Sequence, residues 1–550
     1  MNSFYSKYRD NKTYSIFCLL LLGCAICQLV LTTYFNIFEG RSHMGIDSSW
    51  EYLKVIISAK EGTLFPFRYA NPTTQPEFER IVLAAPLYKL LGNIFAAYGI
   101  ANLVCTIICM ILLYLVMSNL GCKLSTKLIV VNLFLCPYLS NGYDVTNELG
   151  YHECVNGFAA YQNIVSIVIF LVILIAIKFN SEKISIPLVA ITCISIIYVC
   201  INKGMGLVVW LGVPIVIYIF GKSFIENEVR TFFSKQSICL ILFVVCMFVG
   251  RLIGGIMGLT YMDSGLRWAD ASELMQNIGN VLVGIILLLG GIPAEGVSRV
   301  PTSAMGIVYC FGLIIAGVLL IAIIYWIMQM VHDFNKGELN YNILFLLSII
   351  IGNIIFFSLI APYDQVAGTY EVRYLIPAVF AGFILTGAFI ENISGKWLLK
   401  KMGIVALFVS IVALDLYSDY FLAISDNEYL QTEELLAQVE KTDAGIVYFW
   451  DSEKELVQPE RLIRVKDTNR VYKSISYADQ LEDFGDYNYY DDSSLYNGAS
   501  LIITKSGDKV IPDSLLDQYE LLSSVGNYEL YYSDTNPVDL KSFVRYRSEE

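Results

Sequence analysis

The segment IFCLLLLGCAICQLVLTTYFN (residues 16–36) is followed, ten residues later, by DSSWEY (residues 47–52). The first segment is apolar and long enough to cross the ~30 Å hydrocarbon layer of a membrane, which takes about 20 residues. No small-residue cleavage site follows it and many similar segments come later, so we interpret it as a retained span rather than a signal peptide. DSSWEY then places two carboxylates and two aromatic rings close to the membrane surface.

The composition is that of an integral membrane protein. Mean hydropathy is +0.58, 56% of the residues are hydrophobic and only 16% are charged. Soluble domains have about 25% charged residues. A soluble globular protein is therefore excluded.

Eleven apolar runs are candidates for transmembrane helices. The third is the weakest, because its apolar part stops near Leu139 and Pro137 lies inside it. The eleven predicted spans are 16–36, 96–117, 128–145, 162–178, 184–201, 204–221, 237–259, 304–331, 341–361, 374–390 and 402–423.

A further apolar run, Val281–Ile292, lies between the seventh and eighth spans. It is bounded by Gly279, Gly290, Gly291 and Pro293. The sequence therefore favours a re-entrant or interfacial helix here, and if this run crosses the membrane the later topology inverts.

The distribution of basic residues predicts the orientation, because cytoplasmic loops carry an excess of Lys and Arg. With the N-terminus inside, the cytoplasmic segments are rich in basic residues and the outer loops are poor in them for their length. This predicts a multi-pass cell-membrane protein with a cytoplasmic N-terminus and an extracytoplasmic C-terminus. The basic residues concerned are Lys7, Arg9, Lys12, Lys123, Lys127, Lys178, Lys183, Lys222, Arg230, Lys235, Lys336, Lys396, Lys400 and Lys401.

After the eleventh span the composition changes, which predicts a membrane domain over residues 1–425 and a soluble acidic domain over residues 426–550. The second part holds 26 acidic and 12 basic residues, a net charge of −14 in a chain whose total is −13. Such acidity argues against a nucleic-acid partner. All 13 cysteines precede this part, and their spacing shows no paired or metal-binding pattern. We interpret them as core residues.

The C-terminal part has the pattern of a small α/β domain. Glu428–Lys441 has helical spacing, and Pro512–Tyr519 also suggests a helix. Residues 445–450 and 500–504 read as buried strands, and residues 527–532 alternate as a further strand. The Asp- and Tyr-rich run 483–492 is a candidate for binding a sugar or a cation, but a solvated loop is the more common explanation of such a run.

Residues 37–95 form the longest loop of the membrane part and, in the predicted orientation, the first outer loop. Trp50, Leu53 and Ile57 recur at helical spacing, with Lys54 and Lys60 available for lipid headgroups, which predicts an amphipathic helix on the membrane surface. Its start carries Asp47 and, four residues later, Glu51. Helix capping explains Asp47; catalysis also fits, and one residue can serve both.

Another predicted outer loop, Tyr143–Asn163, contains acidic groups and no Lys or Arg. The spacing of Glu148 and His152 resembles a metal-binding pair on a helix, although ordinary loop polarity also explains it. Asp144 and Glu153 lie in the same loop. If the third span exits as placed, these groups face the same side as Asp47.

Four basic residues lie at the predicted outer membrane edge: Lys203, Arg251, Arg267 and Arg373. A charge at membrane depth is a functional hypothesis by default, and the planar fork of Arg suits phosphate. Salt bridges from Arg251 and Arg373 to acidic neighbours such as Asp263 and Glu371 are the competing interpretation. Asp415 and Asp419, one helical turn apart, are interpreted as marking the exit of the last span into water.

Together these features resemble the polytopic GT-C glycosyltransferases, which take sugars from polyprenyl-phosphate carriers. The matching features are about eleven spans, an acidic residue in the first outer loop (Asp47, with Trp50 and Glu51), amphipathic stretches there, and a C-terminal outer α/β domain. The run Arg373-Tyr374-Leu375-Ile376-Pro377 looks like a late-span Arg-Tyr motif of such enzymes. The paired acidic signature of the family is absent, because Ser48 follows Asp47.

The resemblance implies an inverting sugar transfer at the extracytoplasmic face, from a lipid-linked donor to a cell-surface glycan or polymer. Asp47 would be the general base. Arg373 with Tyr374, helped by Arg251 or Lys203, would neutralise the phosphate of the departing carrier. Trp50, Glu51, Asp144, Glu148 and His152 would position the substrate. A divalent cation is optional, since its ligands cannot be identified, and no other cofactor is implied.

Three alternatives remain at this point. A transporter or flippase of a lipid-linked substrate would be expected to carry internal repeats, and none is convincing between the two halves. A polysaccharide polymerase or ligase would place its large outer loop late, whereas the longest loop here is early. The third alternative is a surface or assembly protein without enzymatic activity.

Overall fold

The structure is a computed structural model of the chain. The description of the fold rests on the following residues: 2–40, 46–65, 80–138, 150–158, 160, 162–179, 185–257, 268–292, 300–336, 338–360, 372–393, 397–424, 430–451, 457–467, 470–476, 480–481, 498–508, 511–539 and 544–545.

The chain divides into two compact units. The first consists of residues 1–35 and 102–424, and the second of residues 36–101 and 425–550. The segment that follows the first helix therefore belongs with the C-terminal part of the chain, not with the helices that precede and follow it.

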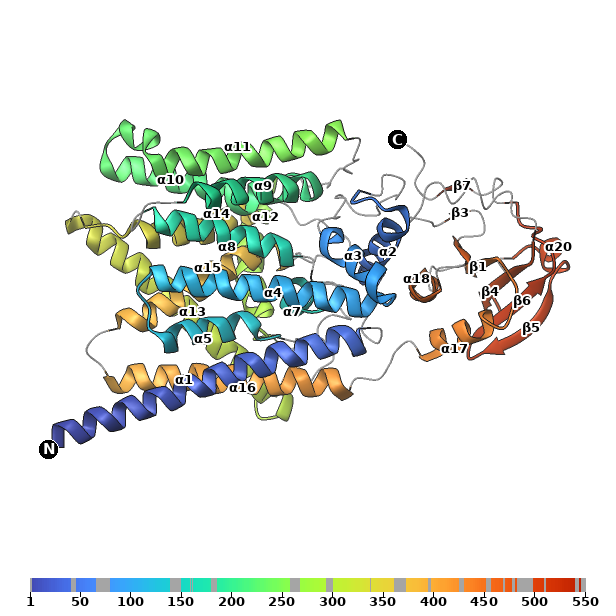
Figure 1. The fold of residues 1–550 in the computed structure, drawn as a ribbon, viewed down its shortest axis with the longest axis horizontal. Coiled ribbons are helices and arrows are strands. Elements are labelled where there is room, and N and C mark those ends of the chain that lie inside the picture. Colours follow the sequence, from blue (N-terminus) through green and yellow to red (C-terminus); the bar gives the residue numbers. More distant parts are fainter. Residues whose placement is uncertain are drawn as a thin grey trace. The chain divides into compact units, whose positions relative to one another are not determined.

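The first unit is a bundle of apolar helices that run side by side (Figure 1). Among the described residues, ten helices of the chain are long and apolar enough to cross a membrane. The predicted polytopic helical membrane fold is confirmed. The main helices are α1 (Asn2–Tyr34), α4 (Ile94–Asn119), α5 (Leu124–Leu135), α8 (Asn163–Lys178), α9 (Ile186–Lys203), α10 (Val213–Glu226), α11 (Lys235–Ile256), α12 (Ala271–Leu288), α13 (Ala304–Lys336), α14 (Tyr341–Leu359), α15 (Ile376–Asn392) and α16 (Trp397–Ile424).

Two predicted spans correspond to shorter helices than expected. The span predicted at 128–145 is the 12-residue helix α5, whose last helical residue is Leu135, two residues before Pro137. Proline disfavours a helical backbone at the residue before it, which accounts for this end. The span predicted at 162–178 is the 16-residue helix α8.

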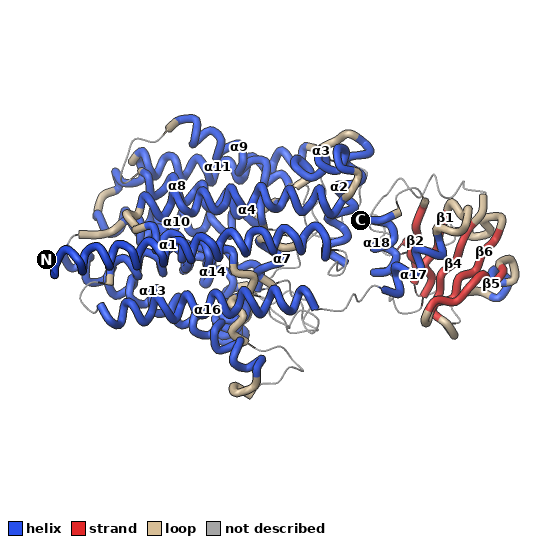
Figure 2. Tube along the Cα trace, turned by 60° about the horizontal axis from the view of Figure 1, so that its bottom comes forward, coloured by secondary structure: helices blue, strands red, loops and turns tan. Residues whose placement is uncertain are grey.

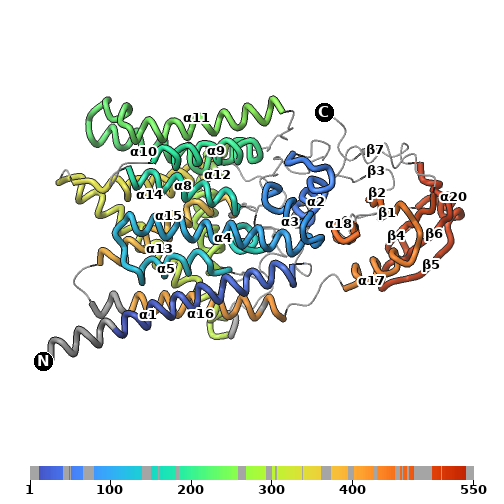
Figure 3. Tube along the Cα trace, in the orientation of Figure 1, coloured from blue at the N-terminus to red at the C-terminus, as the bar shows by residue number. Residues whose placement is uncertain are grey.

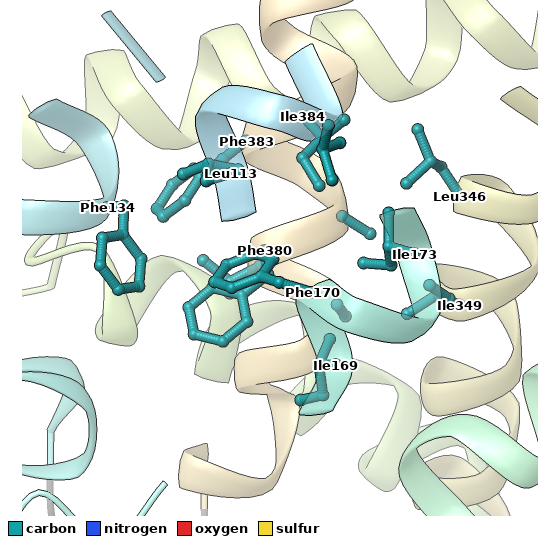
Figure 4. Close-up of a cluster of buried hydrophobic side chains, with 14 of the residues drawn as sticks. Leu113, Phe134, Ile169, Phe170, Ile173, Leu346, Ile349, Phe380, Phe383 and Ile384 are labelled. Carbon is teal, nitrogen blue, oxygen red and sulfur yellow. The ribbon is translucent and has the colours of Figure 1, made fainter. Parts of the chain in front are cut away.

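The centre of the bundle is formed by α8 and α15, in which nearly every side chain is buried. A helix that is apolar all round belongs in such a position. The rings of Phe170 and Phe380 lie 4.9 Å apart, and that of Phe134 lies 5.7 Å from Phe170. Figure 4 shows these rings with the aliphatic side chains that surround them, among them Ile173 and Ile349.

Helix α12 contains the apolar run that was predicted to be re-entrant or interfacial. Near its start, Asn277 donates hydrogen bonds to Ser358 O (3.3 Å) and Ile360 O (2.7 Å), at the last residues of α14. Just after its end, Gly290 approaches Gly312, which lies early in α13. Helix α12 is also long and apolar enough to cross a membrane.

Short elements connect the helices of the first unit. They are the helix α7 (Tyr151–Val155), the π-helix η2 (Val208–Gly212) and the 3₁₀ helices η3 (Val229–Phe233) and η4 (Val372–Leu375). A further π-helix, η1 (Phe35–Glu39), continues from α1.

The second unit contains α2 (Ile46–Glu61), α3 (Ile81–Leu91) and a mixed sheet with its own helices. Figure 2 shows the strands gathered in this one region. The sheet elements are α17 (Leu430–Val439), β1 (Ile446–Asp451), α18 (Val457–Lys466), β2 (Val471–Ser476), β3 (Gln480–Leu481), β4 (Ser500–Lys505), α20 (Asp513–Leu516), β5 (Glu520–Val525), β6 (Tyr528–Ser533) and β7 (Val544–Arg545).

The strand order is β5-β6-β4-β1-β2-β3-β7. Strand β1 is central and pairs in parallel with both β2 and β4, while β6 pairs antiparallel with β4. Every residue of β1 is buried, as expected of a parallel strand covered on both faces. The predicted small α/β domain is confirmed. The expected strands at 445–450, 500–504 and 527–532 are β1, β4 and β6, whereas residues 483–492 lie outside the described part.

Candidate functional site

Helix α2 carries the acidic stretch that the sequence singled out. Asp47 is its second residue and Glu51 lies one turn further on; the side chains of Asp47 and Trp50 lie outside the described part. The helix packs against α3 and α18 within the second unit (Figure 1). Leu53, Val55 and Ile56 are all at most 3% exposed. The helix is therefore buried on several faces and not on one alone.

A group of buried charges lies where α2, α3 and the start of α4 meet. Lys54 Nζ donates to Glu51 Oε1 at 2.9 Å, and both side chains are nearly inaccessible. Tyr98 donates its hydroxyl to Glu51 Oε2 at 3.4 Å and accepts a hydrogen bond from Arg80. We call Glu51, Lys54, Arg80 and Tyr98 the loop cluster.

Aromatic rings enclose the loop cluster. The ring of Tyr52 lies 4.7 Å from that of Tyr98 and 5.2 Å from that of Phe95. The Arg80 guanidinium carbon lies 5.3 Å from the Tyr98 ring centroid. Burial raises the pKa of Tyr52 well above its ordinary value, although the positive charge of Arg80 opposes the shift. Low polarity around these charges strengthens their electrostatic interactions.

The loop cluster contains two groups that bind anions in proteins, an ammonium and a guanidinium, together with one carboxylate. Arg binds phosphate through its planar fork of donors, and Lys does so as a point charge. Arg80 occupies the N-cap position of α3, where the helix dipole also favours an anion.

Lys54 corrects one expectation from the sequence. It was expected to face lipid headgroups from an amphipathic helix, but it is 1% exposed and paired with Glu51. The three-residue spacing of Glu51 and Lys54 was the signal for this pair. The hydrophobic periodicity of Trp50, Leu53 and Ile57 pointed to a different face.

The first unit holds several of the other predicted site residues. His152, on α7, is 1% exposed and packs its ring 5.6 Å from that of Phe158. Lys203 is buried at the end of α9, and Arg251 lies half-buried in α11. Asp144, Glu148, Asp263, Arg267 and Glu371 lie outside the described residues.

Arg373 and Tyr374 form a small aromatic group within the first unit. The Arg373 guanidinium carbon lies 5.5 Å from the Tyr374 ring centroid. Tyr374 stacks on Phe357 at 5.9 Å and contacts Trp210 at 6.1 Å. The predicted Arg-Tyr pair is therefore held between α14 and η2. Asp47 and Arg373 belong to different units.

Arg80 and Tyr98 were not identified from the sequence. Arg80 follows two glutamates in Glu-Phe-Glu-Arg (residues 77–80), which made it look like ordinary loop polarity, and Tyr98 lies in an apolar run. Only their proximity to Glu51 in the folded loop distinguishes them. Within the described residues, no group of three His, Cys, Asp or Glu side chains could hold a metal ion.

The helical bundle and the unit with a small mixed sheet together give the chain the fold of a solved membrane protein. It is similar to ArnT from Cupriavidus metallidurans. The structure of that protein bound to undecaprenyl phosphate matches with a TM-score of 0.52 and 9% identity, covering 95% of this chain and 98% of that one. Its apo structure matches with the same score and identity, covering 94% and 98%. At this identity the likeness defines the fold alone. No family model and no curated protein matches the chain.

Proposed function

We propose that the protein is a membrane glycosyltransferase that moves a sugar from a polyprenyl-phosphate donor to an extracytoplasmic glycan or polymer. The observation that carries this proposal is the buried loop cluster, which places Lys54 and Arg80 beside Glu51. The fold it shares with a protein solved with bound undecaprenyl phosphate supports the same donor class.

In this mechanism the acceptor hydroxyl attacks the anomeric carbon from the face opposite the phosphate, which inverts the configuration. Asp47 takes the hydroxyl proton as the oxygen–carbon bond forms. The bond between the anomeric carbon and the phosphate oxygen breaks, and the polyprenyl phosphate leaves with the bonding electrons. Arg80 and Lys54 stabilise the negative charge on that phosphate.

The proposed orientation places the N-terminus in the cytoplasm and the C-terminal module over residues 426–550 outside the cell. It rests on the excess of Lys and Arg in the segments assigned to the cytoplasm. A reporter enzyme that works only on the extracytoplasmic side should be active when it is fused after Glu550. The same reporter fused between α10 and α11 should be inactive.

The decisive variant is Asp47→Asn, which removes the base. Asn caps a helix about as well as Asp, so the thermal midpoint should stay unchanged while sugar transfer is lost. The matched control is Asp270→Asn, since Asp270 caps α12 in a capping box and should retain transfer. Full activity in Asp47→Asn would remove this mechanism. If the protein moves the lipid-linked sugar across the vesicle membrane without transferring it to an acceptor, the flippase alternative is supported instead.

A further inference from the structure

A second group of buried polar side chains lies inside the first unit, where α1, α5 and α16 pack together (Figure 3). Asp415 was expected to mark the exit of the last span into water, but it is only 8% exposed. Gln28 and Thr32 of α1 are 3% and 5% exposed, and Cys136 at the end of α5 is fully buried. We call Gln28, Thr32, Cys136, Asp415 and Asp419 the bundle cluster.

Hydrogen bonds within the bundle cluster satisfy only part of its polar atoms. Gln28 Nε2 lies 3.4 Å from Asp419 Oδ1, and the Cys136 thiol hydrogen-bonds the Asp415 carboxyl. Asp415 Oδ1 and Thr32 Oγ1 have no hydrogen-bond partner among the described residues. Thr32 lies one turn after Gln28, so both occupy the face of α1 that meets α16.

The charges of the bundle cluster are unbalanced. Asp415 and Asp419 are four residues apart on α16 and raise each other's electrostatic energy. Within the described part of the chain, no Lys, Arg or His forms an ion pair with either carboxylate. The other titratable groups that face them are Cys24, Cys136 and Tyr138, none of which carries a positive charge.

An unbalanced pair of carboxylates inside a membrane bundle is costly unless a cation accompanies it. We propose that the bundle cluster binds a small cation, either a sodium ion or a proton, between Asp415 and Asp419. Sodium would take oxygen ligands, and Asp415 Oδ1 has no hydrogen-bond partner among the described residues. A proton would instead neutralise one of the two carboxyl groups.

A bound cation would tie α1 to α16, which are nearly four hundred residues apart in sequence. Ligands that bind only the folded state raise its stability. The site should therefore be visible in the thermal unfolding of the full-length protein, whether or not the protein transfers sugar. This inference is independent of the proposed function, and neither test bears on the other.

The experiment compares the thermal midpoint of the full chain in detergent with NaCl and with choline chloride at equal ionic strength, at neutral and at mildly alkaline pH. If sodium is the ligand, NaCl raises the wild-type midpoint by about 2 °C or more over choline, and Asp415→Asn abolishes the difference. If a proton is the ligand, the thermal midpoint does not depend on sodium and decreases as pH rises. In Asp415→Asn this decrease with pH should be smaller.

Two further variants keep the test informative. Gln28→Lys places an ammonium group beside Asp419 and should remove the dependence on sodium or pH even if Asp415→Asn does not fold. Asp333→Asn is the matched control: Asp333 accepts from Gln329 at 2.7 Å in α13, the same Gln–Asp pairing, and its replacement should leave the dependence intact. The proposal is overturned if wild type, Asp415→Asn and Gln28→Lys respond alike to sodium and to pH.

Discussion

The loop cluster and the bundle cluster are both buried groups of charged and polar side chains, but they balance charge differently. In the loop cluster, Glu51 receives hydrogen bonds from Lys54 and Tyr98, and Tyr98 links it to Arg80. In the bundle cluster, the hydrogen bonds of Asp415 and Asp419 with described residues come from the neutral groups of Cys136 and Gln28. The first cluster therefore contains its own cations, whereas the described residues of the second include none.

The two clusters should respond oppositely when a carboxylate is removed. Glu51→Gln takes away the carboxylate that Lys54 bonds, and breaking a buried ion pair costs about 3–5 kcal/mol. Asp415→Asn removes one of two repelling charges, so without sodium the midpoint should stay level or rise. Thermal unfolding of both variants in choline chloride measures this.

The control for this comparison is the double variant Glu51→Gln/Lys54→Met. If the cost of Glu51→Gln comes from the unpaired ammonium, replacing Lys54 as well should recover part of the stability. A double variant no more stable than Glu51→Gln alone would show that the pair is not the source. Equal destabilisation by Glu51→Gln and Asp415→Asn would contradict the distinction between the clusters.

The comparison also predicts that the guanidinium group of Arg80 is needed for sugar transfer. Arg80→Ala removes the guanidinium that would stabilise the leaving phosphate, so the rate of sugar transfer should fall by about 10²–10³, as for loss of one stabilising donor. Arg80→Lys keeps the charge but not the fork and should recover part of the rate. Initial rates with a polyprenyl-phosphate sugar would measure both effects.

The matched control for Arg80 is Arg464→Ala. Arg464 lies on α18 in the same unit and pairs with Glu460 at 3.7 Å. Its replacement should leave the transfer rate within about twofold, since Arg464 is not a member of the loop cluster. A comparable loss of rate in both variants would mean that any disturbance of this unit stops transfer, and Arg80 would lose its assigned role.

Much of the fold was predictable because hydrophobic length is a strong signal in a membrane protein. Runs such as 304–331 and 402–423 correspond to long helices, and the strand at 445–450 is β1. The short helix α5 was harder to predict, because the apolar run continues past the residue where the helix ends. The grouping of residues 36–101 with the C-terminal part has no signature in composition or periodicity.

The candidate site was predictable only where its residues are neighbours in sequence. Asp47 and Glu51 stood out because both lie on one short helix after a span. Arg80 and Tyr98 belong to the cluster through the folding of the loop, and no local pattern marks them. Asp415 looked like a span boundary because its partners Gln28 and Cys136 are hundreds of residues away.

A smaller loss of stability is expected when the hydroxyl of Tyr98, which links Glu51 to Arg80, is removed. Tyr98 donates to Glu51 and accepts from Arg80, and a hydrogen bond to a charged group contributes about 1.5–3 kcal/mol. Because the Glu51 contact is long at 3.4 Å, Tyr98→Phe should cost about 1.5 kcal/mol. The measurement is chemical or thermal unfolding, with Tyr420→Phe as control, because the Tyr420 side chain on α16 is 63% exposed. If Tyr98→Phe leaves the free energy of unfolding unchanged, Glu51 and Arg80 act separately.

The smallest effect should come from Lys60, at the other end of α2 from Asp47. Partial desolvation lowers the pKa of the exposed Lys60 side chain below its ordinary value of 10.5, while Asp467 opposes and Arg464 adds to the shift. The unfolded chain then binds the proton more tightly than the folded one, so the stability of the protein should increase as pH rises toward 10.5. Lys60→Met removes this effect. The variant should therefore have a higher thermal midpoint than wild type at neutral pH, and the difference should disappear in the alkaline range. Parallel pH profiles for the two proteins would show that Lys60 is fully solvated, in contrast to Lys54 two turns earlier, whose charge is held by Glu51.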